Sequence, residues 1–271
     1  MKKVMYVIAM VYSMAASMPC IAGFDEGKAA FMAKDFTKAY KEFEPLANKG
    51  DVKSQHLLGM MYDEGQGVPQ NYTKAAEWYM KAAKLGHQDS QYNLGVMYAQ
   101  GQGVLQDDAK SADWFLKAAQ QGHVLSQFAL GRLYILGRGV KADGKLANDW
   151  YRKAAEQHHF KAQLALGKNY LDGNGIKKDL PLAEKWIRQS AEQGHHKAQY
   201  ELGLMYKDGL GLKKDAKLSY MWLELAARQE HQGAILARDA LAKTMKAEDI
   251  AAAKLQASAW TPVILDKKPA T

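Results

Sequence analysis

The chain has 271 residues, of which 48% are hydrophobic and 24% are charged, a balance that excludes both a disordered chain and a membrane protein. The formal net charge is +8, but basic and acidic residues are mixed along the whole sequence, which argues against nucleic-acid binding. Cys20 is the only cysteine, so a disulfide framework is excluded.

The first 22 residues predict a signal peptide. Lysines at positions 2 and 3 precede an apolar stretch, Val4–Ala16, that is too short to span a bilayer. The small residues around Ile21 predict cleavage after Ala22, with cleavage after Gly23 as the alternative. The mature protein would then be periplasmic or secreted and would contain no cysteine. Lipid attachment at Cys20 is a rival interpretation, although proline precedes this cysteine.

From residue 51 the sequence repeats every 36 residues without an insertion, which predicts a helical repeat array. The predicted units are 51–86, 87–122, 123–158, 159–194 and 195–230, and a flexible tail is predicted over 261–271. Each unit has one tryptophan and one Leu-Gly pair at fixed positions. The tryptophans are Trp78, Trp114, Trp150, Trp186 and Trp222, and the glycines are Gly59, Gly95, Gly131, Gly167 and Gly203.

Each unit predicts two amphipathic helices, which cover residues 54–64 and 72–84 in the first unit. Two glycines in the connecting loop, Gly65 and Gly67 in this unit, suit backbone conformations with positive φ. A side chain suited to N-capping precedes every second helix. These capping residues are Asn71, Asp107, Asp143, Asp179 and Asp215.

Glycine inside the first helix of each unit costs about 1 kcal/mol relative to alanine, so its recurrence calls for a compensating gain. We expect it to allow a neighbouring helix to approach closely, with the tryptophan or an alanine of the second helix packed on the bare backbone. The tryptophans are accordingly predicted to be core residues.

Three segments of the second unit, Ser90–Tyr98, Gly101–Val104 and Lys110–Ala119, resemble the Sel-one-like repeat, a helical hairpin related to the tetratricopeptide repeat. The resemblance covers residues 51–230. Residues 24–50 resemble a shorter tetratricopeptide-type hairpin that caps the N-terminal end, and residues 231–260 resemble the capping helices that follow such arrays. The resemblance implies an all-α fold, a right-handed α-solenoid, and a function in macromolecular binding.

Periodic histidines occupy the turn before each first helix and predict turn and capping roles rather than metal binding, because equivalent residues lie about one repeat apart. They are His87, His123, His159, His195 and His231. No catalytic motif or cofactor fingerprint is present, so neither an enzyme nor a cofactor is predicted. Some cysteine-rich members of the resembled family are linked to β-lactam binding or hydrolysis. That activity is the alternative function, and a subunit of a polysaccharide-export or flagellar assembly is a third.

The residues that vary between units form a stripe along the first helices, which by resemblance line the concave groove. The candidate partner-binding residues are Asn93, Val96, Gln100, Ala129, Arg132, Leu136, Ala165, Lys168, Asp172, Glu201 and Leu204. Leu125 and Lys161 extend the same stripe. Arg132 and Lys168 occupy one repeat position in adjacent units and predict contacts with an acidic group of a protein, peptide or cell-envelope partner. The alternative is that the stripe is only a solvated face. The sequence leaves the oligomeric state open.

Overall fold

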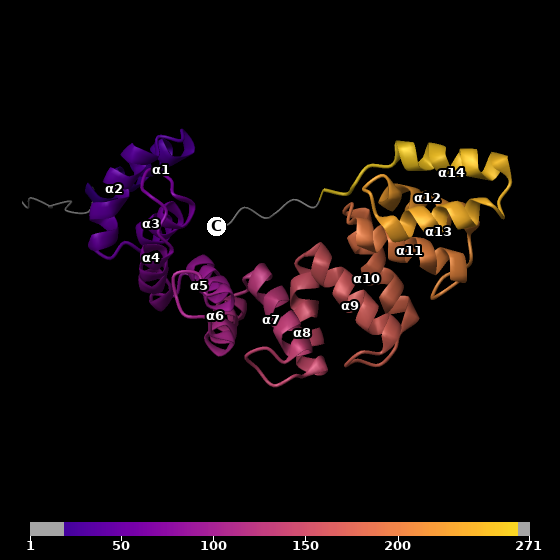
Figure 1. Cartoon of the computed structure of the whole chain (residues 1–271), viewed down its shortest axis with the longest axis horizontal. Helices are drawn as coiled ribbons and strands as arrows, with labels where there is room; N and C mark the ends of the chain where they lie inside the picture. The colour runs from indigo at the N-terminus through magenta and orange to yellow at the C-terminus, as the bar shows by residue number, and fades with distance from the viewer. Residues whose placement is uncertain (1–18, 265–271) are drawn as a thin grey trace, which may run out of the picture. The chain divides into compact units, whose positions relative to one another are not determined.

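The computed structural model describes residues 19–264, and every regular element in that range is an α-helix (Figure 1). The predicted all-α solenoid is confirmed, because consecutive helices pack as pairs. The helices are α1 (Pro19–Met32), α2 (Phe36–Asn48), α3 (Val52–Glu64), α4 (Tyr72–Lys84), α5 (Gln88–Gln100), α6 (Asp108–Gln120), α7 (Val124–Leu136), α8 (Gly144–Glu156), α9 (Phe160–Asp172), α10 (Leu180–Glu192), α11 (His196–Asp208), α12 (Ala216–Ala227), α13 (Gln232–Ala242) and α14 (Ala247–Ala259).

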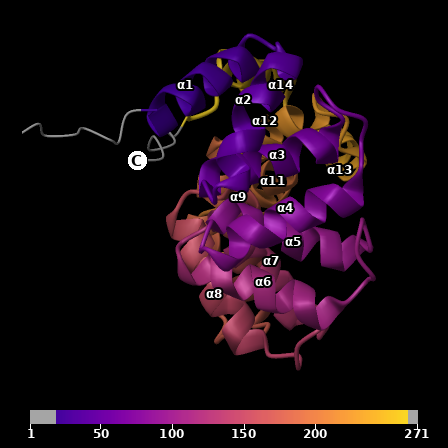
Figure 2. The same cartoon turned by 90° about the vertical axis from the view of Figure 1, so that its left-hand side faces the viewer.

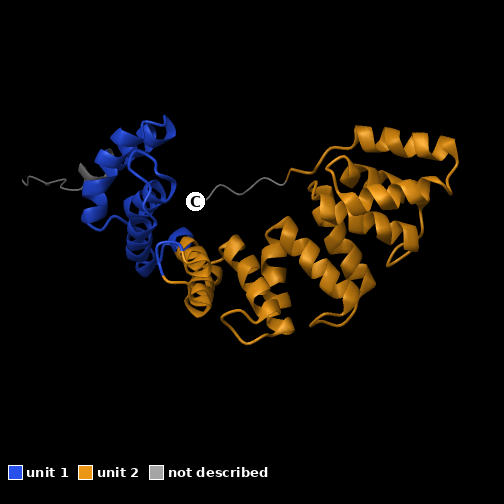
Figure 3. Cartoon of the chain, viewed as in Figure 1, with its two compact units in different colours: residues 1–90, 102–104 blue, residues 91–101, 105–271 orange. Residues whose placement is uncertain are grey.

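The chain forms two compact units, residues 1–90 with 102–104 and residues 91–101 with 105–271 (Figure 3). In the first unit, α1 packs on α2, α2 on α3, and α3 on α4. Phe43, Leu58 and Met61 are fully buried in its core. In the second unit the pairs α7 and α8, α9 and α10, and α11 and α12 pack in succession, and α7 and α8 lie side by side in both views (Figures 1 and 2).

The predicted capping residues begin each second helix. Asn71 and the four equivalent aspartates each accept a hydrogen bond from a backbone N–H of the first turn. At the other end of the loop, Gly137 ends α7 in the left-handed conformation, and its N–H donates to the carbonyl of Leu133. Helix ends leave backbone groups without partners, so these caps define where each helix begins and ends.

The prediction that tryptophan or alanine packs on the helical glycine was wrong. A Cβ at Gly131 would meet the ring of Tyr151, the residue after Trp150, and Gly95 faces Phe115 in the same way. The equivalent residues in the other units are Tyr79, Ile187 and Leu223. Because consecutive helical residues point about 100° apart, only one of each pair can face the glycine.

The tryptophans are not uniformly core residues, which corrects a second prediction. Trp186 and Trp222 are buried, whereas Trp78, Trp114 and Trp150 are only half-buried. Each of these three carries a lysine ammonium 3.7–4.0 Å from its ring centroid, from Lys81, Lys117 and Lys153 respectively. Cation–π contact with a half-exposed ring explains why tryptophan recurs outside the core.

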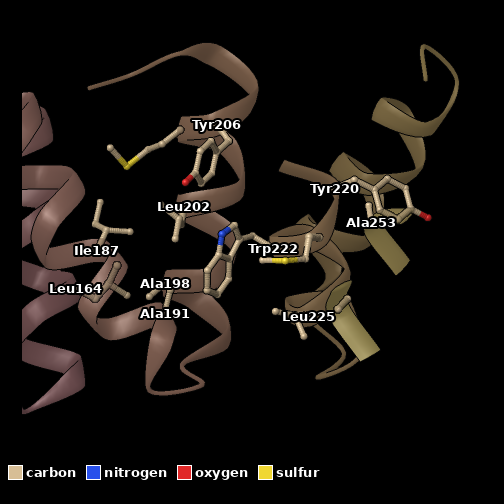
Figure 4. Packing of buried hydrophobic residues seen from close by; sticks show 13 residues of the cluster. Leu164, Ile187, Ala191, Ala198, Leu202, Tyr206, Tyr220, Trp222, Leu225 and Ala253 are labelled. Atoms are coloured by element: carbon tan, nitrogen blue, oxygen red, sulfur yellow. The ribbon is translucent and has the colours of Figure 1, made fainter. Parts of the chain in front are cut away.

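The C-terminal helices α13 and α14 both pack on α12. Ala253 of α14 is fully buried in a cluster that contains Leu202 of α11 and Trp222 of α12 (Figure 4). The Trp260 ring meets the Trp222 ring edge to face at a centroid distance of 5.9 Å. Within the tail predicted from residue 261, the N–H of Val263 donates to the carbonyl of Glu192.

Pairs of glutamines connect helices in the second unit, a feature that sequence reasoning missed. The amide of Gln157, which follows α8, donates to Oε1 of the buried Gln127 on α7, and Gln127 donates to the carbonyl of Ala119. Gln121 with Gln91, Gln193 with Gln163, and Gln229 with Gln199 repeat the first of these bonds. Buried polar groups are stable only when they are paired in this way.

The predicted n-region and apolar stretch of the signal peptide lie outside the described residues, and the predicted cleavage site falls within α1. Between residues 19 and 264 no helix has the length and apolarity needed to cross a bilayer.

Candidate functional site

A cavity of about 340 Å³ opens in the second unit over α5 and α7. Helix α5 contributes side chains spaced about one turn apart, and α7 contributes the equivalent residues of the next repeat. The lining is Tyr92, Val96, Ala99, Gln100, Phe115, Leu125, Phe128, Ala129, Arg132, Leu133, Leu136, Arg138, His159 and Lys161. We call this cavity the α5–α7 groove.

The floor of the α5–α7 groove is apolar. Phe115 and Leu133 are buried beneath it, and Tyr92 and Phe128 are half-buried. Leu136 is exposed over 59% of its surface, so a large apolar side chain stands open at the end of α7. Concave, mostly apolar surfaces with a few polar groups are typical of binding sites.

Basic side chains border the groove. Arg138 is bound by both carboxylate oxygens of Asp108, at 3.1 and 2.6 Å, so its charge is neutralised locally. Within residues 19–264, Arg132 and Lys161 have no carboxylate at ion-pair distance. Burial raises the pKa of Tyr151 to about 12, and the positive charge of the Arg132 guanidinium opposes this rise. The groove therefore combines an apolar floor with two cations that can receive an acidic group.

The structure brings five of the predicted partner-binding residues together in this groove, namely Val96, Gln100, Ala129, Arg132 and Leu136. The other six, Asn93, Ala165, Lys168, Asp172, Glu201 and Leu204, lie elsewhere on the stripe. All eleven are at least partly exposed.

Lys168 does not join Arg132 as an open cation. Its ammonium lies 2.6 Å from Oε1 of Glu201, another member of the stripe. The two residues are 33 positions apart in sequence, and α9 and α11 bring them together. The cations that border the groove without an ion pair are therefore Arg132 and Lys161, and a contact of Lys168 with a partner stays a prediction.

Sequence reasoning missed the aromatic floor. Tyr92 precedes Val96 by four residues and Phe128 precedes Arg132 by four, so helical spacing already placed both rings on the face of the stripe. The aromatic pattern was difficult to recognise in the sequence because the same repeat position holds histidine in the first unit and leucine in the fourth.

The periodic histidines cap helices, as predicted, in four of the five turns. Nδ1 of His87, His123, His159 and His231 each accepts a hydrogen bond from a backbone N–H three residues later. His195 makes no such cap and bonds to Ser190 instead. The non-periodic His56 lies beside His87 and Asp89, with one potential ligand atom from each of the three within 4.8 Å of the others. The expectation that equivalent histidines do not converge on one ion did not consider this residue.

Comparison with protein families and solved structures agrees with the repeat. The Sel1 repeat model matches residues 52–87, 88–123, 124–159, 160–195 and 196–231, each one residue later than the predicted unit. No curated protein sequence matched the chain.

Two solved structures are similar over most of the chain. One is a protective antigen of uropathogenic Escherichia coli with an SLR fold, 34% identical over 90% of this chain, with a TM-score of 0.82. This chain spans 54% of the length of that protein. The other is a Sel1 repeat protein from Oxalobacter formigenes, 33% identical over 76% of this chain and 84% of its own, with a TM-score of 0.73.

Proposed function

Because this chain belongs to the Sel1 repeat family, whose helical scaffolds typically mediate protein–protein interactions, we propose that it is an exported scaffold that binds a protein partner in the α5–α7 groove. An apolar side chain of the partner would occupy the floor, and a neighbouring carboxylate would bind between Arg132 and Lys161. The proposed scaffold has no catalytic role.

The observation that carries this proposal is the pairing of an open apolar floor with unneutralised cations. Exposed leucine and half-buried aromatic rings lose unfavourable contact with water when a partner covers them. Positive charge at the edge of a concave surface attracts an acidic segment and fixes its orientation. Export is supported by the basic and apolar segments that begin the sequence.

Charge reversal tests the proposed groove. Arg132→Glu combined with Lys161→Glu should weaken binding of the partner by at least about ten-fold, because a buried or partly buried charge pair that loses one member costs about 2 kcal/mol or more. The partner is first isolated from the native cell envelope by crosslinking, and its affinity for purified variants is then measured by calorimetry.

The matched control reverses two exposed lysines that do not line the groove, Lys141→Glu with Lys145→Glu. This variant has the same net charge as the test variant and should bind the partner with nearly unchanged affinity. Lys81 and Lys117 are unsuitable controls, because each stacks on a tryptophan ring. Equal losses of affinity in both double variants would show that net charge, and not the groove, determines binding.

A further inference from the structure

We propose that His56, His87 and Asp89 form a binding site for a divalent transition metal ion of the zinc class. His56 lies on α3, His87 lies in the turn before α5, and Asp89 is the second residue of α5. One potential ligand atom from each side chain lies within 4.8 Å of the other two. Two imidazoles and a carboxylate are ligands that zinc prefers, and three protein ligands leave a fourth position for water.

The two imidazole rings are stacked beside each other. Their centroids are 4.3 Å apart and their planes are inclined by 29°. The turn that follows α4 positions His87, and α3 presents His56 from the neighbouring hairpin. A small rotation of each ring can therefore direct one nitrogen to a shared ion without moving a helix.

Ser90 supplies the outer contacts that such a site needs. Its hydroxyl oxygen, on a fully buried residue, lies 2.9 Å from Nδ1 of His56 and 3.2 Å from Nδ1 of His87. If both Nδ1 atoms carry protons and donate to this oxygen, Nε2 of each ring is left as the metal ligand. Histidines that bind metals usually donate their second nitrogen to such an acceptor. The cost is the 3.3 Å cap from the N–H of Ser90 to Nδ1 of His87, which metal binding would displace.

The charges around the site favour a cation. Burial lowers the pKa of His56 to about 4 and also lowers the pKa of His87. The Asp89 carboxylate acts on both rings in the opposite sense, and Lys53 contributes a positive charge that lowers the pKa of His87 further. A carboxylate inside the ligand set outweighs an ammonium outside it.

Comparison with the other repeats separates this site from ordinary packing. Each later turn keeps the histidine of position 87 but lacks both other ligands. The residues at the positions of His56 and Asp89 are Tyr92 and Leu125, Phe128 and Lys161, Leu164 and Lys197, and Tyr200 and Gly233. A tyrosine, phenylalanine or leucine therefore satisfies the packing at His56. Only at the turn of His87 do both positions hold metal ligands, and there the three side chains converge.

Cobalt(II) titration tests the site, because tetrahedral Co²⁺ bound by histidine and carboxylate has intense visible d–d absorption. The purified, untagged full chain without its predicted signal peptide should bind one equivalent of Co²⁺, which Zn²⁺ displaces. His56→Tyr and Asp89→Leu introduce the residues found at the equivalent positions 92 and 125. Each change should weaken binding by at least about ten-fold. Ser90→Ala should weaken it by about ten-fold while leaving the ligands in place, since alanine occupies the equivalent positions 162, 198 and 234. Circular dichroism checks that each variant is folded.

The control variant, His158→Gln with His196→Gln, removes histidines outside the site and should bind Co²⁺ with unchanged affinity. A converse variant, Tyr92→His with Leu125→Asp, completes the same ligand set around His123, which already lies 2.9 Å from the hydroxyl of Ser126. It should bind a second equivalent. Co²⁺ affinity that is unchanged in His56→Tyr and Asp89→Leu, binding weaker than millimolar in the wild type, or the lack of a second equivalent would overturn the proposal.

Discussion

One buried glutamine, in the first repeat, lacks a hydrogen bond that the equivalent glutamines of the later repeats make. Gln55 is buried and donates to the carbonyl of Ala47, but its Oε1 has no partner among the described residues. In the later repeats a glutamine at the end of the second helix donates to this oxygen. The first repeat has Leu85 at that position, with 60% of its surface exposed. An unpaired buried acceptor is a local cost that one substitution can remove.

Leu85→Gln should therefore stabilise the protein by about 1 kcal/mol, because the new amide can donate to Oε1 of Gln55 and little apolar burial is lost. The free energy of unfolding is measured by urea denaturation followed by circular dichroism. The reverse change, Gln157→Leu, removes the donor to Gln127 and should destabilise by about 1–3 kcal/mol. A Leu85→Gln variant that is less stable than the wild type would refute this interpretation of the glutamine pairs.

At the level of single residues, sequence alone predicted local chemistry better than packing partners. Asp143 was identified as a cap because a cap needs only a short side chain at a helix start. The packing partner of Gly131 was misidentified. Tryptophan occupies the position of Trp150 in every unit, whereas the position that contacts the glycine, that of Tyr151, holds tyrosine, phenylalanine, isoleucine or leucine. Invariance within the repeat marks a residue as structural but does not show which face it occupies.

Helix α9 illustrates how an element can depend on pH through its cap. Nδ1 of His159 accepts a hydrogen bond from the N–H of Ala162, which requires an unprotonated nitrogen. Burial, with a smaller contribution from the nearby Lys161, lowers the pKa of His159 to about 4. In the unfolded chain the pKa returns to about 6.5. Between these two pKa values the unfolded state therefore binds more protons than the folded state. The contribution of this cap to stability is fully present above pH 6.5 and is lost as the pH falls towards 4.

His159→Asp should reduce this pH dependence and keep the cap, because Asp51 caps α3 at the equivalent position. The measurement is the slope of the unfolding free energy against pH between about 6.5 and 4.5. His158→Asn serves as the control, since His158 does not cap α9 and asparagine tolerates its positive φ. A His159→Asp variant with the wild-type slope would show that the cap does not titrate in this range.

For the whole molecule, periodicity made the architecture predictable, and loss of periodicity made the binding site difficult to predict. Repeat boundaries, helix pairs and caps follow from residues that recur every 36 positions. The α5–α7 groove instead depends on residues that differ between repeats and on contacts between helices. The ion pair of Lys168 with Glu201 joins helices of different repeats, so no pattern within one unit could show that Lys168 is neutralised.

Site-specific photocrosslinking tests most directly whether the α5–α7 groove binds the partner. A photoreactive phenylalanine analogue replaces Leu136, which is exposed in the groove, or Leu146 on α8, which is 41% exposed and does not line it. In cells that export the full chain, we expect a discrete crosslinked product from position 136 that disappears when Arg132→Glu and Lys161→Glu are added, and no such product from position 146. A product of equal yield from position 146, or a product from position 136 that survives the charge reversal, would contradict the proposed binding site.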